Sequence, residues 1–207
     1  MTHPNTIDAI MRTASVIPVL VIDDAAHARP IAEALVKGGL RVLEVTLRTA
    51  AALDVIREMS KVEGAIVGAG TVLNEADLRA SIDAGSQFIV SPGLTEPLGK
   101  AAIASGIPFL PGTANAGDIM RGLDLGLTRF KFFPAEAAGG LKALKALAGP
   151  FGNVRFCPTG GITQATAPDW LAEEAVLCVG GSWIVGKGAP DVAVIEAAAR
   201  AASALRG

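Results

Sequence analysis

The sequence has no tyrosine, two histidines and two cysteines among its 207 residues. His3 lies in the N-terminal tail and His27 at the front of the first long helix that we expect. The chain therefore has almost no histidines that could serve in a catalytic triad, as a general base or as metal ligands. We expect no metal and no cofactor. Cys157 and Cys178 fall in apolar, strand-like runs, which is typical of small buried side chains and not of a disulfide framework.

Charge and long apolar runs are also scarce. The formal net charge is -2, which offers no basic footprint for nucleic acid. No run of about 18 consecutive apolar residues occurs, so we expect no membrane partner. Residues 1–12 carry Asp8 and lack a basic segment followed by an apolar core, so we expect no secretory signal and a cytoplasmic protein. The hydrophobic content of 51% predicts a large buried core.

Short apolar runs alternate along the chain with longer segments of helical period, which is the pattern of repeated βα units. Eight runs are expected to form strands: 16–22, 41–46, 65–70, 87–91, 108–111, 129–133, 154–158 and 175–179. The expected helices are 6–13, 25–37, 50–60, 75–84, 96–105, 116–125, 141–147, 164–171 and 190–205. Eight units without a linker predict one domain over residues 1–207, an α/β fold that forms a single (β/α)8 TIM barrel with an N-terminal helix at its bottom.

An open, doubly wound sheet is the structural alternative to the barrel. That fold commonly carries a G-x-G-x-x-G loop after its first strand. This chain has Ile22, Asp23, Asp24 and Ala25 at that place instead, which favours the barrel.

Lys131 stands inside an aromatic, strand-like run, residues 129–134, which contains three phenylalanines. Apolar surroundings disfavour a charged ammonium group and favour the neutral amine, which attacks a carbonyl to form a Schiff base. The alternative is a lysine whose stem packs on phenylalanine while its ammonium group reaches water. The polar residues on the other strands decide between the two interpretations.

The second expected strand carries polar residues on one face. A period of two places Glu44, Thr46 and Arg48 together, although barrel strands are normally apolar on both faces. An ion pair that seals the barrel end is the structural alternative, but buried pairs add little net stability. We therefore favour Glu44 as a proton shuttle and Arg48 as a clamp for a carboxylate. In the sixth strand, Lys131 and Phe133 share a face, so Lys131 is expected to meet Glu44 while Phe133 excludes water.

The remaining strand ends suggest a substrate with two polar ends. Thr71 follows the third strand and offers a hydroxyl to a carboxylate, whereas Pro92 belongs to a rigid Pro-Gly turn with a lining role at most. A glycine pair occurs after each of the last two strands, where barrels commonly bind phosphate. The first pair is Gly160 and Gly161, and the second pair ends at Gly181 and is followed by Ser182. The substrate should then carry a phosphate at one end and a carbonyl near Lys131.

Six runs of this sequence closely resemble the bacterial 2-keto-3-deoxy-6-phosphogluconate (KDPG) aldolases of the Entner-Doudoroff pathway. They are residues 44–49, 68–73, 91–93, 130–136, 156–162 and 180–183. The resemblance implies a metal-independent, homotrimeric barrel that cleaves KDPG to pyruvate and glyceraldehyde 3-phosphate. By matching positions it implies Lys131 as the Schiff-base lysine and Glu44 as the general acid and base. It also implies Arg48 and Thr71 near the pyruvate carboxylate and Thr159 beside the substrate. The residues that it implies around the phosphate are Gly160, Gly161, Gly181 and Ser182.

The same family includes enzymes for 2-keto-3-deoxy-6-phosphogalactonate, and many members also act on 4-hydroxy-2-oxoglutarate (KHG). Residues 46–49 look like the gluconate type, whereas the loop 112–117 differs from common members and bears on loop shape and side activities. Two other functions stay open. A phosphosugar isomerase or epimerase would use the glycine pairs without needing Lys131, and a phosphate-sensing module would release no pyruvate.

Overall fold

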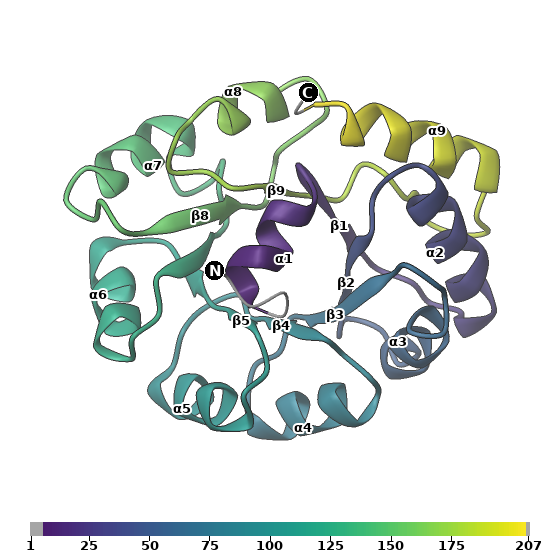
Figure 1. The fold of residues 1–207 in the computed structure, drawn as a ribbon, viewed down its shortest axis with the longest axis horizontal. Helices are drawn as coiled ribbons and strands as arrows, with labels where there is room; N and C mark the ends of the chain where they lie inside the picture. Colours follow the sequence, from purple (N-terminus) through teal and green to yellow (C-terminus); the bar gives the residue numbers. More distant parts are fainter. Residues whose placement is uncertain (1–5, 206–207) are drawn as a thin grey trace.

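The computed structural model describes residues 6–205, so His3 lies outside the described residues. The strands are β1 Val16–Leu20, β2 Val42–Thr46, β3 Ile66–Gly70, β4 Phe88–Val90, β5 Phe109–Leu110, β6 Gly112–Thr113, β7 Arg129–Phe132, β8 Arg155–Pro158 and β9 Val179–Gly181. The helices are α1 Ile7–Thr13, η1 Ala25–His27, α2 Ala28–Lys37, α3 Ala52–Met59, α4 Glu75–Asp83, α5 Glu96–Ser105, α6 Ala116–Asp124, α7 Gly140–Ala148, α8 Ala167–Leu171 and α9 Val192–Ser203. Figure 1 shows the strands in a ring, with α1 across its centre and the other α-helices outside.

Every expected strand and helix has a counterpart, and several helices begin where a side chain caps the first turn. The side chains of Asn74, Thr95 and Asn115 each accept a hydrogen bond from a backbone N–H at the start of α4, α5 and α6. Gly106 ends α5 in the left-handed conformation, at φ 72°, which glycine adopts without steric cost. Short loops between capped elements keep the strand ends close together.

The strands are all parallel, but they form two sheets instead of one continuous barrel of eight strands. The larger sheet has the order β5-β4-β3-β2-β1-β9 and the smaller one the order β6-β7-β8. The expected strand at 108–111 corresponds to β5. After Pro111, which has no N–H group to donate to a neighbouring strand, the chain forms the separate strand β6. The structure therefore confirms a curled parallel α/β fold, whereas a closed barrel of eight strands stays a prediction.

Individual hydrogen bonds and bridges connect the two sheets. The Lys131 N–H of β7 donates to the Pro111 carbonyl at 2.8 Å, next to the end of β5. On the other side, an isolated bridge joins Thr159, just after β8, to Gly180 of β9. The sheets are thus neighbours at both of their edges, as the ring in Figure 1 shows.

Two layers of apolar side chains surround the strands. The inner layer contains residues from α1 and the inward faces of the strands: Ile10, Met11, Ile17, Val42, Phe88, Val90, Leu110, Cys157, Leu177 and Cys178. The outer layer, between strands and helices, includes Leu43, Val45, Phe130 and Phe132. Both cysteines are buried in the inner layer, as expected for small apolar side chains.

Helix α1 closes the end of the ring at which the strands begin. Its N-terminus is capped by Thr6, whose side chain accepts a hydrogen bond from the N–H of Ala9. Asp8 pairs with Arg12 of the same helix and with Arg129 at the start of β7. Burial raises the pKa of Asp8, but the hydrogen bonds and charges of the two arginines together outweigh it and leave the pKa below its usual value. The open end of the ring is therefore the one at which the strands finish.

Across residues 6–205, the structure contains no helix with the length and apolarity needed to span a membrane.

Candidate active site

Lys131 and Glu44 meet inside the ring. The Lys131 side chain comes from β7 and the Glu44 side chain from β2, and Lys131 Nζ lies 3.0 Å from Glu44 Oε1. The two residues are only 5% and 3% exposed. Lys131 is thus no snorkelling side chain, and the expectation that it shares the interior with Glu44 is confirmed. A buried amine in contact with a carboxylate can pass a proton directly to it.

The Glu44 carboxylate occupies space that a glycine leaves open. A Cβ atom on Gly70, at the end of β3, would lie 2.2 Å from Glu44 Oε1. Strand β3 pairs with β2, and Gly70 lies beside Thr46, so Gly70 borders the Glu44 carboxylate. Thr46 is buried and donates its hydroxyl to the Leu20 carbonyl at 2.8 Å. The strand end that carries Glu44 is thereby tied to β1.

Arg48 and Thr71 lie together after the neighbouring strands β2 and β3. Arg48 Nε is 3.4 Å from Thr71 Oγ1, and the arginine is exposed. Arg48 forms no ion pair with any residue in the range 6–205, so its positive charge is open to a ligand. Thr71 has φ 60°, and a β-branched residue in that conformation is strained. This conformation places the threonine hydroxyl beside the guanidinium group, and the surrounding structure must offset its cost.

Phe133 lies beside the Lys131 side chain, and the Pro92 backbone lies beside Gly112, which is on β6 and neighbours Lys131. Lys131 Nζ lies 5.3 Å from the centroid of the Phe133 ring, within cation–π range. Gly112 pairs with Lys131 across β6 and β7, and a Cβ on Gly112 would lie 2.1 Å from the Pro92 carbonyl oxygen. The buried Ser91 hydroxyl donates to the Gly93 carbonyl at 2.6 Å and fixes this Pro-Gly turn.

Thr159 and the glycine pair continue the site beyond β8. Thr159 is buried, and a Cβ on Gly180 would lie 2.2 Å from its hydroxyl oxygen. Gly160 and Gly161 have φ 104° and 81°, which other residues rarely adopt. A Cβ on Gly160 would lie 3.5 Å from the Phe133 ring, so the turn adjoins the wall of the lysine site. Among residues 6–205, the N–H of Gly161 donates to no backbone or side-chain acceptor.

The last strand lies further along the chain than expected. We expected it at 175–179, but only Val176 of the residues before β9 forms a bridge, and β9 itself is Val179–Gly181. Gly181 pairs with Pro18 of β1, so it belongs to the strand and the exposed Ser182 begins the turn. The apolar run 175–179 contacts β8 through the bridge of Val176 to Phe156, but continuous pairing with β1 begins only at Val179, opposite Val16.

These contacts form a continuous path across the open end of the ring. It leads from Arg48 through Thr71, Gly70, Glu44, Lys131 and Phe133 to the glycine pair. The structure thus brings together a cation, a nucleophilic amine, a carboxylate and a turn with an unpaired backbone N–H. Within the part of the chain that is described, no group of three or more His, Cys, Asp or Glu side chains is arranged to hold a metal ion.

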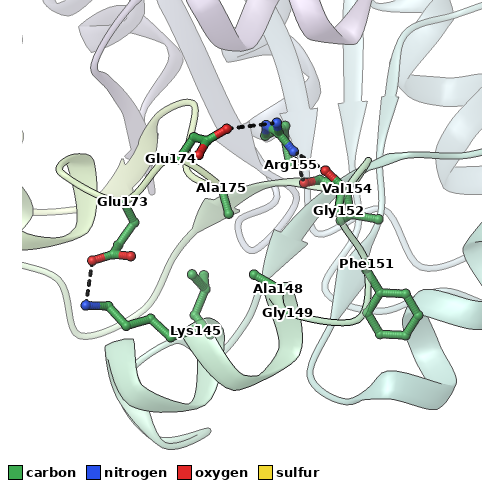
Figure 2. Close-up of a pocket in the computed structure, with 11 residues that line it drawn as sticks. Lys145, Ala148, Gly149, Phe151, Gly152, Val154, Arg155, Glu173, Glu174 and Ala175 are labelled. Carbon is green, nitrogen blue, oxygen red and sulfur yellow. Dashed lines mark hydrogen bonds and ion pairs between the residues drawn. The ribbon is translucent and has the colours of Figure 1, made fainter.

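A separate cavity of about 400 Å³ lies at the start of β8, beside α7 (Figure 2). Figure 2 shows Lys145 facing Glu173, at 2.6 Å, and Arg155 facing Glu174, at 3.7 Å. Thr159 follows the opposite end of the same strand, so this cavity is not part of the candidate site. The charged groups that line it are paired with one another.

Comparison with known proteins identifies the family of the chain that carries these residues. The sequence model of the family described as KDPG and KHG aldolase matches residues 7–198. The chain belongs to this aldolase family. A crystal structure of the 2-keto-3-deoxy-6-phosphogluconate aldolase of Zymomonas mobilis ZM4 with 3-phosphoglycerate is 61% identical, with a TM-score of 0.96 over 99% of this chain and 98% of that chain.

Two further members of the aldolase family bear on its chemistry. The KHG/KDPG aldolase of Escherichia coli (strain K12) is 58% identical over 86% of this chain and 84% of that protein. A KDPG aldolase of Legionella pneumophila, crystallised with pyruvate captured as a covalent carbinolamine intermediate, is 42% identical, with a TM-score of 0.92 over 98% of both chains. Each match extends over most of both chains.

Some residues of this aldolase site carry no local sequence signal. Gly180 was not among the expected site residues, yet it makes room for Thr159. Glu136, after β7, packs on Gly161; it ends one of the runs that resemble the family, but the sequence assigned it no role. Both relationships connect segments that are distant in sequence, so only the folded chain reveals them.

Proposed function

We propose that this protein is a class I aldolase that cleaves KDPG to pyruvate and glyceraldehyde 3-phosphate through a Schiff base on Lys131. The observation that carries the proposal is the buried 3.0 Å contact between Lys131 Nζ and Glu44 Oε1. This contact supplies a nucleophile and a proton shuttle in one site that excludes water.

The reaction begins when Glu44 takes a proton from Lys131 Nζ and the neutral amine attacks the C2 ketone. Glu44 returns this proton to the C2 oxygen to give the carbinolamine, then carries a second proton from the attached nitrogen to the C2 hydroxyl, and water leaves as the iminium ion forms. Glu44 then accepts the proton of the C4 hydroxyl while the C3–C4 bond breaks and its electron pair moves toward the iminium nitrogen. The aldehyde leaves, and an enamine of pyruvate remains on Lys131.

The second half of the reaction returns the enzyme to its starting state. Protonated Glu44 delivers its proton to C3 of the enamine, which restores an iminium ion. Water adds to C2, the carbinolamine collapses and pyruvate is released from the Lys131 amine. No step requires a metal or a cofactor.

The ends of the substrate fit the two ends of the contact path. Arg48 and Thr71 are suited to the C1 carboxylate, because a guanidinium group and a hydroxyl both donate hydrogen bonds to carboxylate oxygens. Gly160, Gly161, Gly181 and Ser182 are proposed to hold the C6 phosphate, and the unpaired N–H of Gly161 supports this. Pro92, Phe133 and Thr159 would line the keto-acid between them.

The relatives support both the chemistry and a second substrate. The Legionella pneumophila relative forms a carbinolamine with pyruvate, which is the intermediate that this mechanism requires. The Escherichia coli relative is named for KHG as well as KDPG, so we propose a side activity on KHG. A preference for the galactonate epimer remains the alternative substrate assignment.

The wider setting is proposed from the resemblance to the family. We propose that residues 1–207 act as one (β/α)8 barrel domain, since the connections at Pro111 and Thr159 link the two sheets at both edges. We also propose a cytoplasmic homotrimer with no nucleic acid or membrane partner. Light scattering coupled to size-exclusion chromatography tests the trimer, and a monomeric mass would contradict it.

A side-by-side assay tests the function. Pyruvate release is followed by a coupled lactate dehydrogenase reaction with KDPG, its galactonate epimer or KHG as substrate. We expect release from KDPG to be the most efficient and release from KHG to be slower. Absence of pyruvate from all three would contradict the proposal. Isomerisation or epimerisation of a phosphosugar that survives Lys131→Ala would favour the rival enzyme class.

A further inference from the structure

The Gly160–Gly161 turn is held from one side by the segment that follows β7. The Ala135 N–H donates to the Thr159 carbonyl at 2.8 Å, and the Glu136 N–H donates to the Gly160 carbonyl at 3.1 Å. These two hydrogen bonds attach the backbone before and within the turn to the residues that follow Lys131 in sequence. Among residues 6–205, the N–H of Gly161 has no protein acceptor and is left for a ligand.

The Glu136 side chain reinforces this attachment. A Cβ on Gly161 would lie 2.6 Å from Glu136 Cγ, so the glutamate stem packs directly on the glycine. Glu136 Oε1 accepts a hydrogen bond from Trp170 Nε1 at 3.3 Å. Trp170 lies in α8, is 2% exposed and stacks at an angle on Phe132. Glu136 is thus fixed between a buried tryptophan and the turn.

Glycines at φ 104° and 81° have wide conformational freedom, so a turn made of them needs external support to keep one shape. We propose that Glu136 is a positioning residue, which holds the Gly160–Gly161 turn in its phosphate-binding shape through its hydrogen bond to Trp170. The proposal rests on the function proposed above for the glycine turn, and it adds a residue that determines the preference for phosphorylated substrates.

The chemistry of Glu136 distinguishes a positioning role from direct binding. A carboxylate repels a phosphate, so it would not be placed beside the turn as a phosphate ligand. Glutamine keeps the stem and an oxygen that accepts the indole hydrogen bond, but it has no charge. Alanine removes both the packing on Gly161 and the acceptor for Trp170. The positioning role therefore predicts that glutamine retains what alanine loses.

The test compares Glu136→Ala and Glu136→Gln with KDPG and with KHG, which has no phosphate. For Glu136→Ala we expect the KM for KDPG to rise about fivefold or more, because one supporting hydrogen bond is lost, and kcat to stay the same. The kcat/KM for KHG should change by less than about twofold. Glu136→Gln should restore the KM for KDPG. Glu174→Ala is the matched control, since it removes an exposed carboxylate far from the turn and should leave both substrates unaffected.

Two results would overturn the proposal. One is an equal loss on KDPG and KHG in Glu136→Ala, which would indicate general damage to the fold. The other is a KM for KDPG that Glu136→Gln does not restore. Calorimetric titration with inorganic phosphate separates this inference from the proposed function. If the unchanged protein releases no pyruvate, the aldolase is rejected. If phosphate then binds more weakly to Glu136→Ala but not to Glu136→Gln, the positioning role is still supported.

Discussion

Lys131 Nζ and Glu44 Oε1 lie 3.0 Å apart, although the two residues are 87 positions apart in the sequence. Strands β7 and β2 belong to different sheets, so only the curling of the sheets into a ring brings the two side chains together. A buried pair of this kind adds little net stability, because removing two charges from water opposes their attraction. The proposed chemistry explains its presence, since the same pair would supply the amine and the proton shuttle of an aldolase.

Glu44→Gln tests the proton shuttle. Glutamine keeps the size of the side chain but cannot accept a proton from Lys131 or from the C4 hydroxyl. We expect kcat for KDPG to fall about 10²- to 10⁴-fold while KM changes much less. Steady-state kinetics measure both constants, and a kcat close to that of the unchanged protein would remove Glu44 from its role.

Gly70→Ala tests whether the position of the Glu44 carboxylate matters. The added methyl group would meet Glu44 Oε1 at 2.2 Å and displace the carboxylate from Lys131. A displacement of about 1 Å can lower kcat about 10²-fold. Gly152→Ala is the control, because no atom lies within 4 Å of its added Cβ. Equal activity in the two variants would contradict the role assigned to Gly70.

Arg48→Ala tests the carboxylate clamp. Arg48 is exposed, and within residues 6–205 its side chain bonds to Thr71 alone, so we expect the free energy of unfolding to change by less than about 0.5 kcal/mol. The KM for KDPG should rise about 10- to 100-fold, because the variant loses a charge-assisted hydrogen bond to the substrate carboxylate. Urea unfolding and steady-state kinetics check the two expectations. Arg57→Ala, which alters an exposed arginine on α3, should change neither quantity.

Asp8→Asn tests the attachment of α1. The folded pKa of Asp8 lies below 3.8, so its contribution to stability is present above pH 3.8 and is lost as the pH falls through the folded value. We expect the variant to lose about 1 kcal/mol of unfolding free energy at pH 7 and the difference to vanish in acid. Urea unfolding across this pH range measures it. Asp54→Asn, whose side chain is 66% exposed, should lose less than about 0.5 kcal/mol.

Local patterns in the sequence were sufficient for much of the fold and for the centre of the site. The alternation of apolar and polar residues in β2 and β7 correctly placed Glu44 and Lys131 inside and Phe130 and Phe132 outside. These predictions succeed because the side-chain period of a strand depends only on its own backbone.

Predictions that depended on pairing between distant segments were less accurate. The bounds of β9 were missed because they depend on its partner β1 and not on the apolar run before it. Likewise, the importance of Gly70 and Gly180 arises from atoms on other strands, namely the side chains of Glu44 and Thr159. The position of Glu136 on Gly161 is a contact of the same long-range kind.

Borohydride trapping tests the central claim most directly. Incubation with pyruvate and sodium borohydride reduces the iminium ion to a stable secondary amine, which peptide mass spectrometry locates on a single residue. We predict the adduct on Lys131, and none in Lys131→Ala. An adduct on another lysine, or one that persists in Lys131→Ala, would contradict the account.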